Sequence, residues 1–84
     1  MKWGLVIASR AKRQFRRIPS DDRDAIDAAF FEMCNDPFSG DFKSLQGFDG
    51  LRRRVRDWRI LYKLDEQRRV IVVTAIKRRG SGTY

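Results

Sequence analysis

Arginines at alternating positions are the first feature of this chain that could do chemistry. One residue separates Arg52 from Arg54, and one separates Arg54 from Arg56. Leu51 and Val55 occupy the other set of alternate positions along this segment. On an extended strand, side chains at alternate positions share a face, so the three guanidinium groups would project from one side. Cationic groups held this close repel one another unless an anion lies among them. The spacing therefore favours a site for a phosphate group.

Two further arginines follow at spacings that bring them toward the same surface. Arg59 alternates with Trp58 and Ile60 on the next predicted strand, and Arg78 follows the last one. If the row that contains Trp58 and Ile60 packs on a layer of helices, Arg59 points to the open side of the sheet. The residues expected to converge on this open face are Arg52, Arg54, Arg59 and Arg78.

The remaining basic residues of this region have different expected positions. Arg53 falls on the side of the apolar residues, where we expect its stem to be covered and its charged head to stay in water at the sheet edge.

Arg52 and Arg54 keep their charge at any ordinary pH, so neither serves readily as a general base. Lys77 is the residue that could transfer a proton, and we expect its side chain to face away from Arg78.

The first half of the chain reads as a strand followed by two helices. Residues 2–8 are an apolar run dense enough for a buried strand, and Ser9 is placed to cap a helix that ends near Arg17. Pro19 separates this helix from a second one, which runs from Ser20 to about Asn35. Two helices joined by so short a turn are expected to pack as an antiparallel hairpin. Residues 36–50 contain Pro, Gly and Ser breakers and read as a loop.

From Leu51 the hydrophobic period changes from helical to two. This pattern predicts strands over 51–55, 58–64 and 69–76, joined by tight turns. The last strand is apolar on both faces, so it is expected to be central in the sheet. The predicted fold class is α+β: an N-terminal strand, an antiparallel helix hairpin and a three-stranded antiparallel meander, with the helices packed on one face of a small sheet. The whole chain, 1–84, forms one domain with a flexible tail over 77–84.

The positive charge of the chain is concentrated in its second half. Residues 1–42 carry seven Lys and Arg against seven Asp and Glu, whereas residues 43–84 carry twelve against four. The entire formal net charge of +8 therefore belongs to the second half. Charge that only keeps a protein soluble would be spread more evenly, whereas a concentrated basic surface attracts polyanions.

Composition excludes several other classes of function. With one cysteine, Cys34, and no histidine, an internal disulfide is impossible and the usual zinc ligands are nearly absent. We therefore expect no metal and no cofactor. No apolar run is long enough to span a membrane, and the first ten residues are too short for the apolar region of a signal peptide. A cytoplasmic location fits these features.

The order of several motifs resembles a known family. LRRRVRDWRILYKLD followed by VIVVTAIKRRGSGTY is similar to the RelE branch of the RelE/ParE toxins of bacterial type II toxin–antitoxin systems. The likeness extends to RAKRQFRRIP near the start, to the DPF loop and to KSLQG before the sheet. It therefore covers nearly the whole chain.

This resemblance implies a ribosome-dependent endoribonuclease that cuts mRNA in the ribosomal A site through the 2′-hydroxyl of the RNA. It also implies contacts with 16S rRNA and a cognate antitoxin that wraps the toxin in a hetero-oligomer. We expect an acidic, partly apolar antitoxin segment to cover the basic sheet and the helices. The positions that match the family's cleavage set are Arg52, Arg54, Arg59, Arg78 and Tyr84, with Tyr84 stacking on a base. The residues expected to bind RNA around them are Arg56, Lys77 and Arg79.

Other functions stay open at this stage. The ParE branch of the same fold poisons DNA gyrase and generally lacks the basic cleavage set, so the presence of that set here favours RNA. A third alternative is a basic RNA-binding module, or a decayed toxin that contacts only its antitoxin. The ordinary structural alternatives are an ion pair of Arg59 with Asp57 or Glu66, and a disordered Tyr84 at the chain end.

Overall fold

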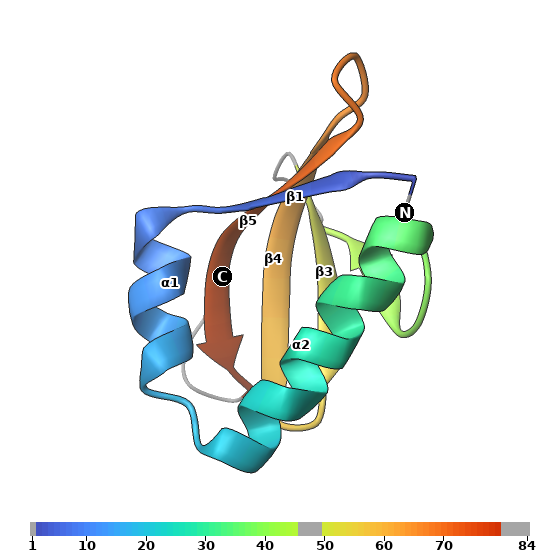
Figure 1. Cartoon of the computed structure of the whole chain (residues 1–84). Coiled ribbons are helices and arrows are strands. Elements are labelled where there is room, and N and C mark those ends of the chain that lie inside the picture. The colour runs from blue at the N-terminus through green and yellow to red at the C-terminus, as the bar shows by residue number, and fades with distance from the viewer. Residues whose placement is uncertain (1, 46–49, 80–84) are drawn as a thin grey trace.

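The computed structural model describes residues 2–45 and 50–79 of the 84-residue chain. In chain order these residues form β1 (Gly4–Ile7), α1 (Ser9–Arg16), α2 (Ser20–Asn35), β2 (Phe42–Ser44), β3 (Leu51–Val55), β4 (Trp58–Asp65) and β5 (Val70–Arg78). The strands form one sheet in the order β1-β5-β4-β3-β2, in which β1 is parallel to β5 and the other pairs are antiparallel. Neither described helix is long and apolar enough to cross a membrane. The α+β class predicted from the sequence is confirmed (Figure 1).

The core lies between the helices and one face of the sheet. Ile60 and Tyr62 of β4 are almost fully buried there, and Trp58 and Leu64 pack against them partly buried, as the period-two pattern predicts. β5 lies between β1 and β4, so its predicted central position is also confirmed. The buried members of the core are Ala11, Ile18, Ile26, Ala29, Phe30, Met33, Ile60, Tyr62, Ile71, Val73 and Ile76.

The first helix begins differently from the way the sequence suggests, and the second begins as predicted. The predicted side-chain cap of α1 is wrong, because Ala8 occupies the N-cap and Ser9 is already helical, with no side-chain hydrogen bond at this end. α2 begins at Ser20 as predicted, with Asp21 and Asp22 in its first turn, where carboxylates interact favourably with the helix dipole. Figure 1 shows α1 running alongside β5 and α2 returning across the sheet.

Two segments that read as irregular belong to the sheet. Phe42–Ser44, inside the predicted loop 36–50, forms the edge strand β2 against β3. Three residues are too few to show a period, so only the pairing with β3 reveals this strand. Lys77 and Arg78, expected in the flexible tail, complete β5 by pairing with β4. Residues 80–84 lie outside the described residues.

Arg53 does not reach water at the sheet edge as expected. Its side chain is buried on the helix side, where it forms an ion pair with Glu32 and donates hydrogen bonds to Ala29 O at 3.4 Å and Ser39 Oγ at 3.0 Å. Gly40 makes room for it, because a Cβ at this position would lie 2.6 Å from Arg53 Cζ. A buried cation is tolerated when hydrogen bonds and an opposite charge surround it. Arg53 therefore joins β3 to α2 and to the loop that follows.

The Arg53–Glu32 pair leads to a stability prediction. Glu32→Ala leaves a buried guanidinium with weaker partners and should lower the free energy of unfolding by about 1–3 kcal/mol. Arg53→Met removes the charge and retains the apolar stem, so it should be less destabilising. Urea unfolding of both variants checks this order. A neutral Glu32→Ala together with a strongly destabilising Arg53→Met would contradict it.

A second prediction concerns alkaline pH. The Tyr62 hydroxyl donates a hydrogen bond of 2.7 Å to Pro37 O, and burial raises the pKa of Tyr62 from 10.0 to about 12. Because the pKa is higher in the folded state, this contribution to stability is complete below pH 10 and is lost as the pH rises toward 12. Unfolding followed between these pH values should show a smaller decline in Tyr62→Phe than in the parent protein. An identical decline in both proteins would show that Tyr62 titrates normally.

Candidate nucleic-acid interface

The pairing of β3, β4 and β5 brings three cationic side chains into one row. Arg54 lies opposite Arg59, and Arg59 lies opposite Lys77 on its other side. Paired residues share a face, and neighbouring strands lie about 4.7–4.9 Å apart, so the three side chains leave the sheet close together. We call Arg54, Arg59 and Lys77 the basic row, and the sheet face away from the helices the open face.

Arg52 lies beside the basic row and is held by a residue that the sequence did not single out. Arg52 pairs with Lys43 of β2, which adds another cation to the open face. Arg52 Nη1 lies 3.5 Å from Asp41 Oδ1 and donates a hydrogen bond of 3.3 Å to Asp41 O. Arg54 Nη1 lies 4.0 Å from the other carboxylate oxygen of Asp41. Asp41 therefore lies within ion-pair distance of both arginines, although no sequence motif points to it.

The positive charges of Arg52 and Arg54 are only partly balanced by the carboxylate of Asp41. The single carboxylate of Asp41 is shared by Arg52 and Arg54, and its side chain is 60% exposed. The Nε of Arg54 is buried and has no hydrogen-bond partner among the residues that the structure describes. An anion placed beside Arg54 would therefore lower the electrostatic free energy of the cluster.

A β-bulge determines which basic residue of β5 joins the row. Tyr62 pairs with Val73, but Leu61 pairs with Ala75, so Thr74 is an extra residue on β5. An extra residue in one strand reverses which face each later side chain occupies. Strict alternation along β5 therefore predicts the wrong face for every residue after Thr74.

The expectation that Arg78 lies on the open face is wrong for this reason. Arg78 pairs with Trp58 on the helix side, and its Cζ lies 5.7 Å from the centroid of the Trp58 ring. Lys77 takes the position opposite Arg59 and faces away from Arg78, as expected. After the hydrogen bonds from Trp58 and Arg56, the charge of Arg78 also lowers the pKa of Asp22 on α2.

Arg56 is also separated from the open face. Its backbone adopts a left-handed conformation, with φ of 54°, in the turn after β3, so the alternation ends before it. Arg56 Nη1 lies 3.0 Å from Asp22 Oδ1, and Trp58 Nε1 donates a hydrogen bond of 2.9 Å to the other oxygen of Asp22. These two hydrogen bonds, led by that of Trp58, hold the pKa of Asp22 below its usual value. Arg56 thus ties the β3–β4 turn to α2.

The last two predicted site residues lie at the end of the described chain or beyond it. Arg79 is exposed just after β5, and its backbone N–H donates a hydrogen bond of 2.7 Å to Asp57 O. Tyr84 lies outside the described residues, so base stacking by Tyr84 stays a prediction.

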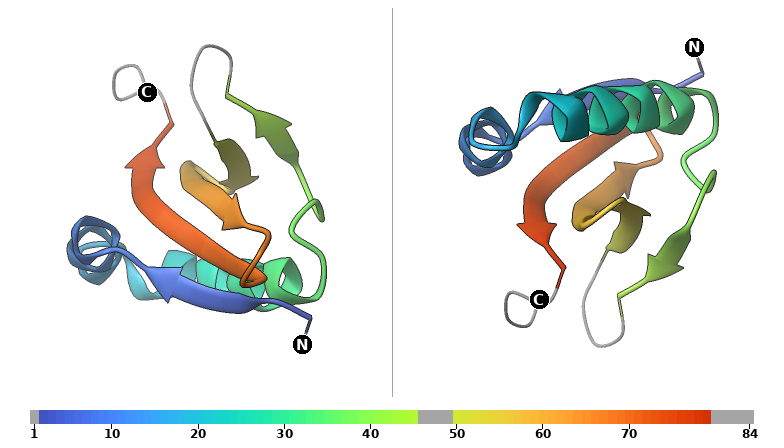
Figure 2. Two further views of the ribbon diagram at one scale, coloured as in Figure 1. Left: turned by 90° about the horizontal axis from the view of Figure 1, so that it is seen from above. Right: turned by 90° about the horizontal axis from the view of Figure 1, so that it is seen from below.

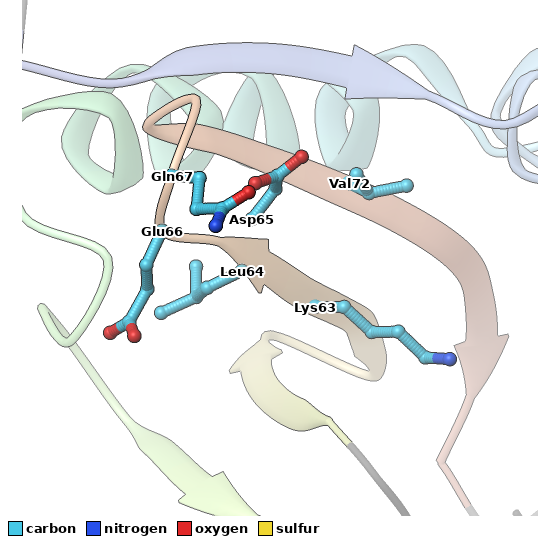
Figure 3. A pocket seen from close by; sticks show the side chains of 6 residues that line it. All are labelled: Lys63, Leu64, Asp65, Glu66, Gln67 and Val72. Carbon is cyan, nitrogen blue, oxygen red and sulfur yellow. The ribbon is translucent and has the colours of Figure 1, made fainter.

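A hollow of about 460 Å³ beside the β4–β5 turn does not coincide with the basic row (Figure 3). Asp65 and Glu66 contribute two carboxylates to its lining against the one ammonium group of Lys63, so the hollow does not favour a phosphate. Arg59 lies near the other end of β4. The candidate interface is therefore the surface around the basic row, whose three side chains are half-buried.

Known proteins match this chain in family and in fold. A family model described as the ParE toxin of the type II toxin–antitoxin system parDE matches residues 5–81. No curated protein matches the chain in sequence. Among solved structures, the archaeal RelE–RelB complex from Pyrococcus horikoshii OT3 matches at 20% identity and a TM-score of 0.84, covering 98% of this chain and 100% of the other.

Two bacterial structures give the same fold. The RelBE2 toxin–antitoxin complex of Mycobacterium tuberculosis matches at 20% identity and a TM-score of 0.82, covering 94% of this chain and 100% of the other. The isolated RelE toxin of E. coli matches at 19% identity and a TM-score of 0.79, covering 95% and 87%. Because the family model extends over residues 5–81, this chain belongs to the ParE toxin family and is a RelE/ParE-superfamily toxin of a type II toxin–antitoxin system.

Proposed function

We propose that this toxin cleaves RNA on the open face of its sheet and that the basic row binds the phosphodiester that is cut. The observation that carries the proposal is the register that places Arg54, Arg59 and Lys77 opposite one another on three adjacent strands. A site built on strands is held more precisely than a site on loops.

The chemistry that suits this row is attack by an RNA 2′-hydroxyl on the neighbouring phosphorus. The 2′-oxygen forms a new bond to phosphorus, and the bond to the 5′-oxygen of the next nucleotide breaks. Negative charge accumulates on the phosphoryl oxygens in the transition state, where Arg54 and Arg59 would offer fixed, forked donors. Arg52, buried against Asp41, would position Arg54.

Lys77 gives the row a group that arginine cannot replace. The 2′-hydroxyl must lose a proton and the leaving 5′-oxygen must gain one. A guanidinium keeps its proton at any ordinary pH, whereas an ammonium group can exchange one. We assign proton transfer to Lys77, whose place beside Arg59 depends on the bulge at Thr74.

The substrate and partner follow from the same family. The resemblance to the RelE branch suggests mRNA in the ribosomal A site, with 16S rRNA beside it, as the substrate. Solved relatives include toxin–antitoxin complexes from an archaeon and a bacterium, which supports a cognate antitoxin as the protein partner. An antitoxin that covers the open face would block the basic row directly.

Inhibition of DNA gyrase is the second candidate function. One observation favours it, because the family model that matches this chain carries the name of the ParE toxin. The basic row favours RNA cleavage instead, since a protein that only binds gyrase has no need of cations aligned across three strands.

The first functional prediction compares three arginines in a ribosome-dependent mRNA cleavage assay. Arg59→Ala should reduce the rate of cleavage about 100-fold or more, because it removes a donor to the transition state. Arg78→Ala should cause a smaller loss, because Arg78 lies on the opposite face over Trp58. Arg68→Ala is the matched control, since this arginine is in the β4–β5 turn with 83% of its side chain exposed.

Equal losses for Arg59→Ala and Arg68→Ala would contradict the assignment of the basic row. Intact mRNA at a stoichiometric dose of the parent toxin, together with inhibition in a gyrase supercoiling assay, would replace RNA cleavage by the second candidate function.

A second functional prediction separates proton transfer from charge at Lys77. Lys77→Arg retains the positive charge and should retain RNA affinity, but it should lower the rate of cleavage at saturating RNA. Lys77→Met should lower both affinity and rate. Single-turnover kinetics with both variants measures the two quantities separately. Full cleavage activity in Lys77→Arg would show that the proton is transferred by another group.

A further inference from the structure

Helix α1 carries a second concentration of positive charge that the proposed cleavage site does not use. Its sequence, SRAKRQFR, contains no acidic residue, and Ala11 is its buried residue. Phe15 packs partly buried against the core. The cationic residues on the rest of its surface are Arg10, Lys12, Arg13, Arg16 and, at the C-cap, Arg17.

Within residues 2–45 and 50–79, none of these cations of α1 forms an ion pair with a carboxylate. The acidic residues of α2 that do form ion pairs interact with the sheet: Asp22 with Arg56, and Glu32 with Arg53. The first half of the chain has no formal net charge because its positive charges, most of them on α1, are balanced by the negative charges of α2 and the loop after it.

The arrangement is unfavourable for α1 as an isolated element. Arg10 and Lys12 lie near its N-terminus, where the helix dipole disfavours positive charge. Like charges three or four residues apart on a helix also repel, and Arg13 has such neighbours in Arg10, Arg16 and Arg17. The same dipole favours Arg13 and Arg16 in the last turn and Arg17 at the C-cap, so the unfavourable part is the charge of the first turn and the repulsion between neighbouring arginines.

Three of the arginines form a stripe around a hollow. Arg10, Arg13 and Arg17, together with Gln14, line a half-open space of about 230 Å³ on the surface of α1. Gln14 is fixed there, because its Oε1 accepts a hydrogen bond of 2.7 Å from the backbone N–H of Ile76 on β5. We call Arg10, Arg13 and Arg17 the α1 stripe.

The α1 stripe and the basic row lie on two sides of the same part of β5. β1 pairs with β5 only as far as Val73, and α1 packs alongside the remainder of that strand (Figures 1 and 2). Ile76, which binds Gln14, directly precedes Lys77 of the basic row. A polyanion bound at the row therefore meets the α1 stripe if it continues past β5.

We infer that the α1 stripe binds the sugar–phosphate backbone of RNA at a position outside the cleavage site. This inference rests on the proposed function, because it takes RNA as the ligand of the basic row. The stripe would add affinity and orient the toxin, and it would take no part in the chemical step. Contacts to phosphates alone make this binding insensitive to base sequence.

The composition of the stripe favours RNA over an acidic protein segment. Stable protein interfaces have an apolar centre, whereas nucleic-acid interfaces are more polar and much more positively charged. The hollow is lined by three arginines and one glutamine, without an apolar residue. The exposed apolar side chains of the described chain, Val6, Phe31, Phe38 and Phe42, belong to other elements.

The test measures binding of a 2′-O-methyl single-stranded RNA, which cannot be cleaved, by fluorescence anisotropy at several salt concentrations. The triple variant Arg10→Gln/Arg13→Gln/Arg17→Gln should lower the slope of log affinity against log salt by up to about 2, at about 0.7 for each phosphate that the stripe no longer neutralises. The matched control, Lys2→Gln/Arg23→Gln/Arg68→Gln, removes the same charge from other surfaces and should change the slope less. Replacement of the three stripe arginines by lysine should retain the slope, because lysine also binds phosphate.

The melting temperature distinguishes loss of binding from loss of folding. Removal of like charges relieves repulsion along α1 but also removes Arg13 and Arg17 from the end that the helix dipole favours, so the melting temperature should change little. Equal slopes for the stripe and control variants would overturn the inference while leaving cleavage at the basic row intact. A stripe variant that keeps its RNA affinity but loses affinity for the co-purified antitoxin would also overturn it. Absence of salt-dependent RNA binding by the parent toxin would instead contradict the proposed function itself.

Discussion

The register of β3 against β4 determines where every arginine of the central basic segment lies. A shift of one residue would turn Arg53 to the open face and would bury Arg52 and Arg54 against the helices. The partners of Arg53 oppose such a shift, because its guanidinium binds Glu32, Ala29 and Ser39 from the helix side. Arg53 therefore contributes to the site although it lies on the opposite face, because its contacts keep Arg52 and Arg54 on the open face.

Acidic residues hold the β3–β4 hairpin on both of its faces, near its turn. Asp41, before β2, holds Arg52 and Arg54 in place on the open face. Asp22, at the start of α2, binds Arg56 and Trp58 on the helix side. Each carboxylate meets two groups, and beside these partners Arg54 and Arg56 keep 38% and 54% of their side chains exposed. A thin core of this size could not bury such charge without partners.

Most of the fold could be predicted from the sequence, because hydrophobic period and chain breakers determine the helices and the three long strands. The row Trp58, Ile60, Tyr62 and Leu64 was predicted from alternation alone, and the open positions of Arg54 and Arg59 followed from it. Alternation failed at Thr74, since nothing in VIVVTAIKRR marks an extra residue, and Lys77 and Arg78 consequently exchange faces. The helix-side position of Arg53 was also predicted, but its full burial was not, because its partners Glu32 and Ser39 are distant in sequence.

The central claim is that a scissile phosphodiester lies among Arg54, Arg59 and Lys77. The most direct measurement is a crystal structure of the toxin with a short RNA whose attacking 2′-hydroxyl is methylated, so that it binds without being cut. The account predicts a phosphate on the open face within hydrogen-bonding distance of Arg54 and Arg59, with the methylated 2′-oxygen toward Lys77. A phosphate bound instead on the helix side, beside Arg78 and Trp58, would contradict it.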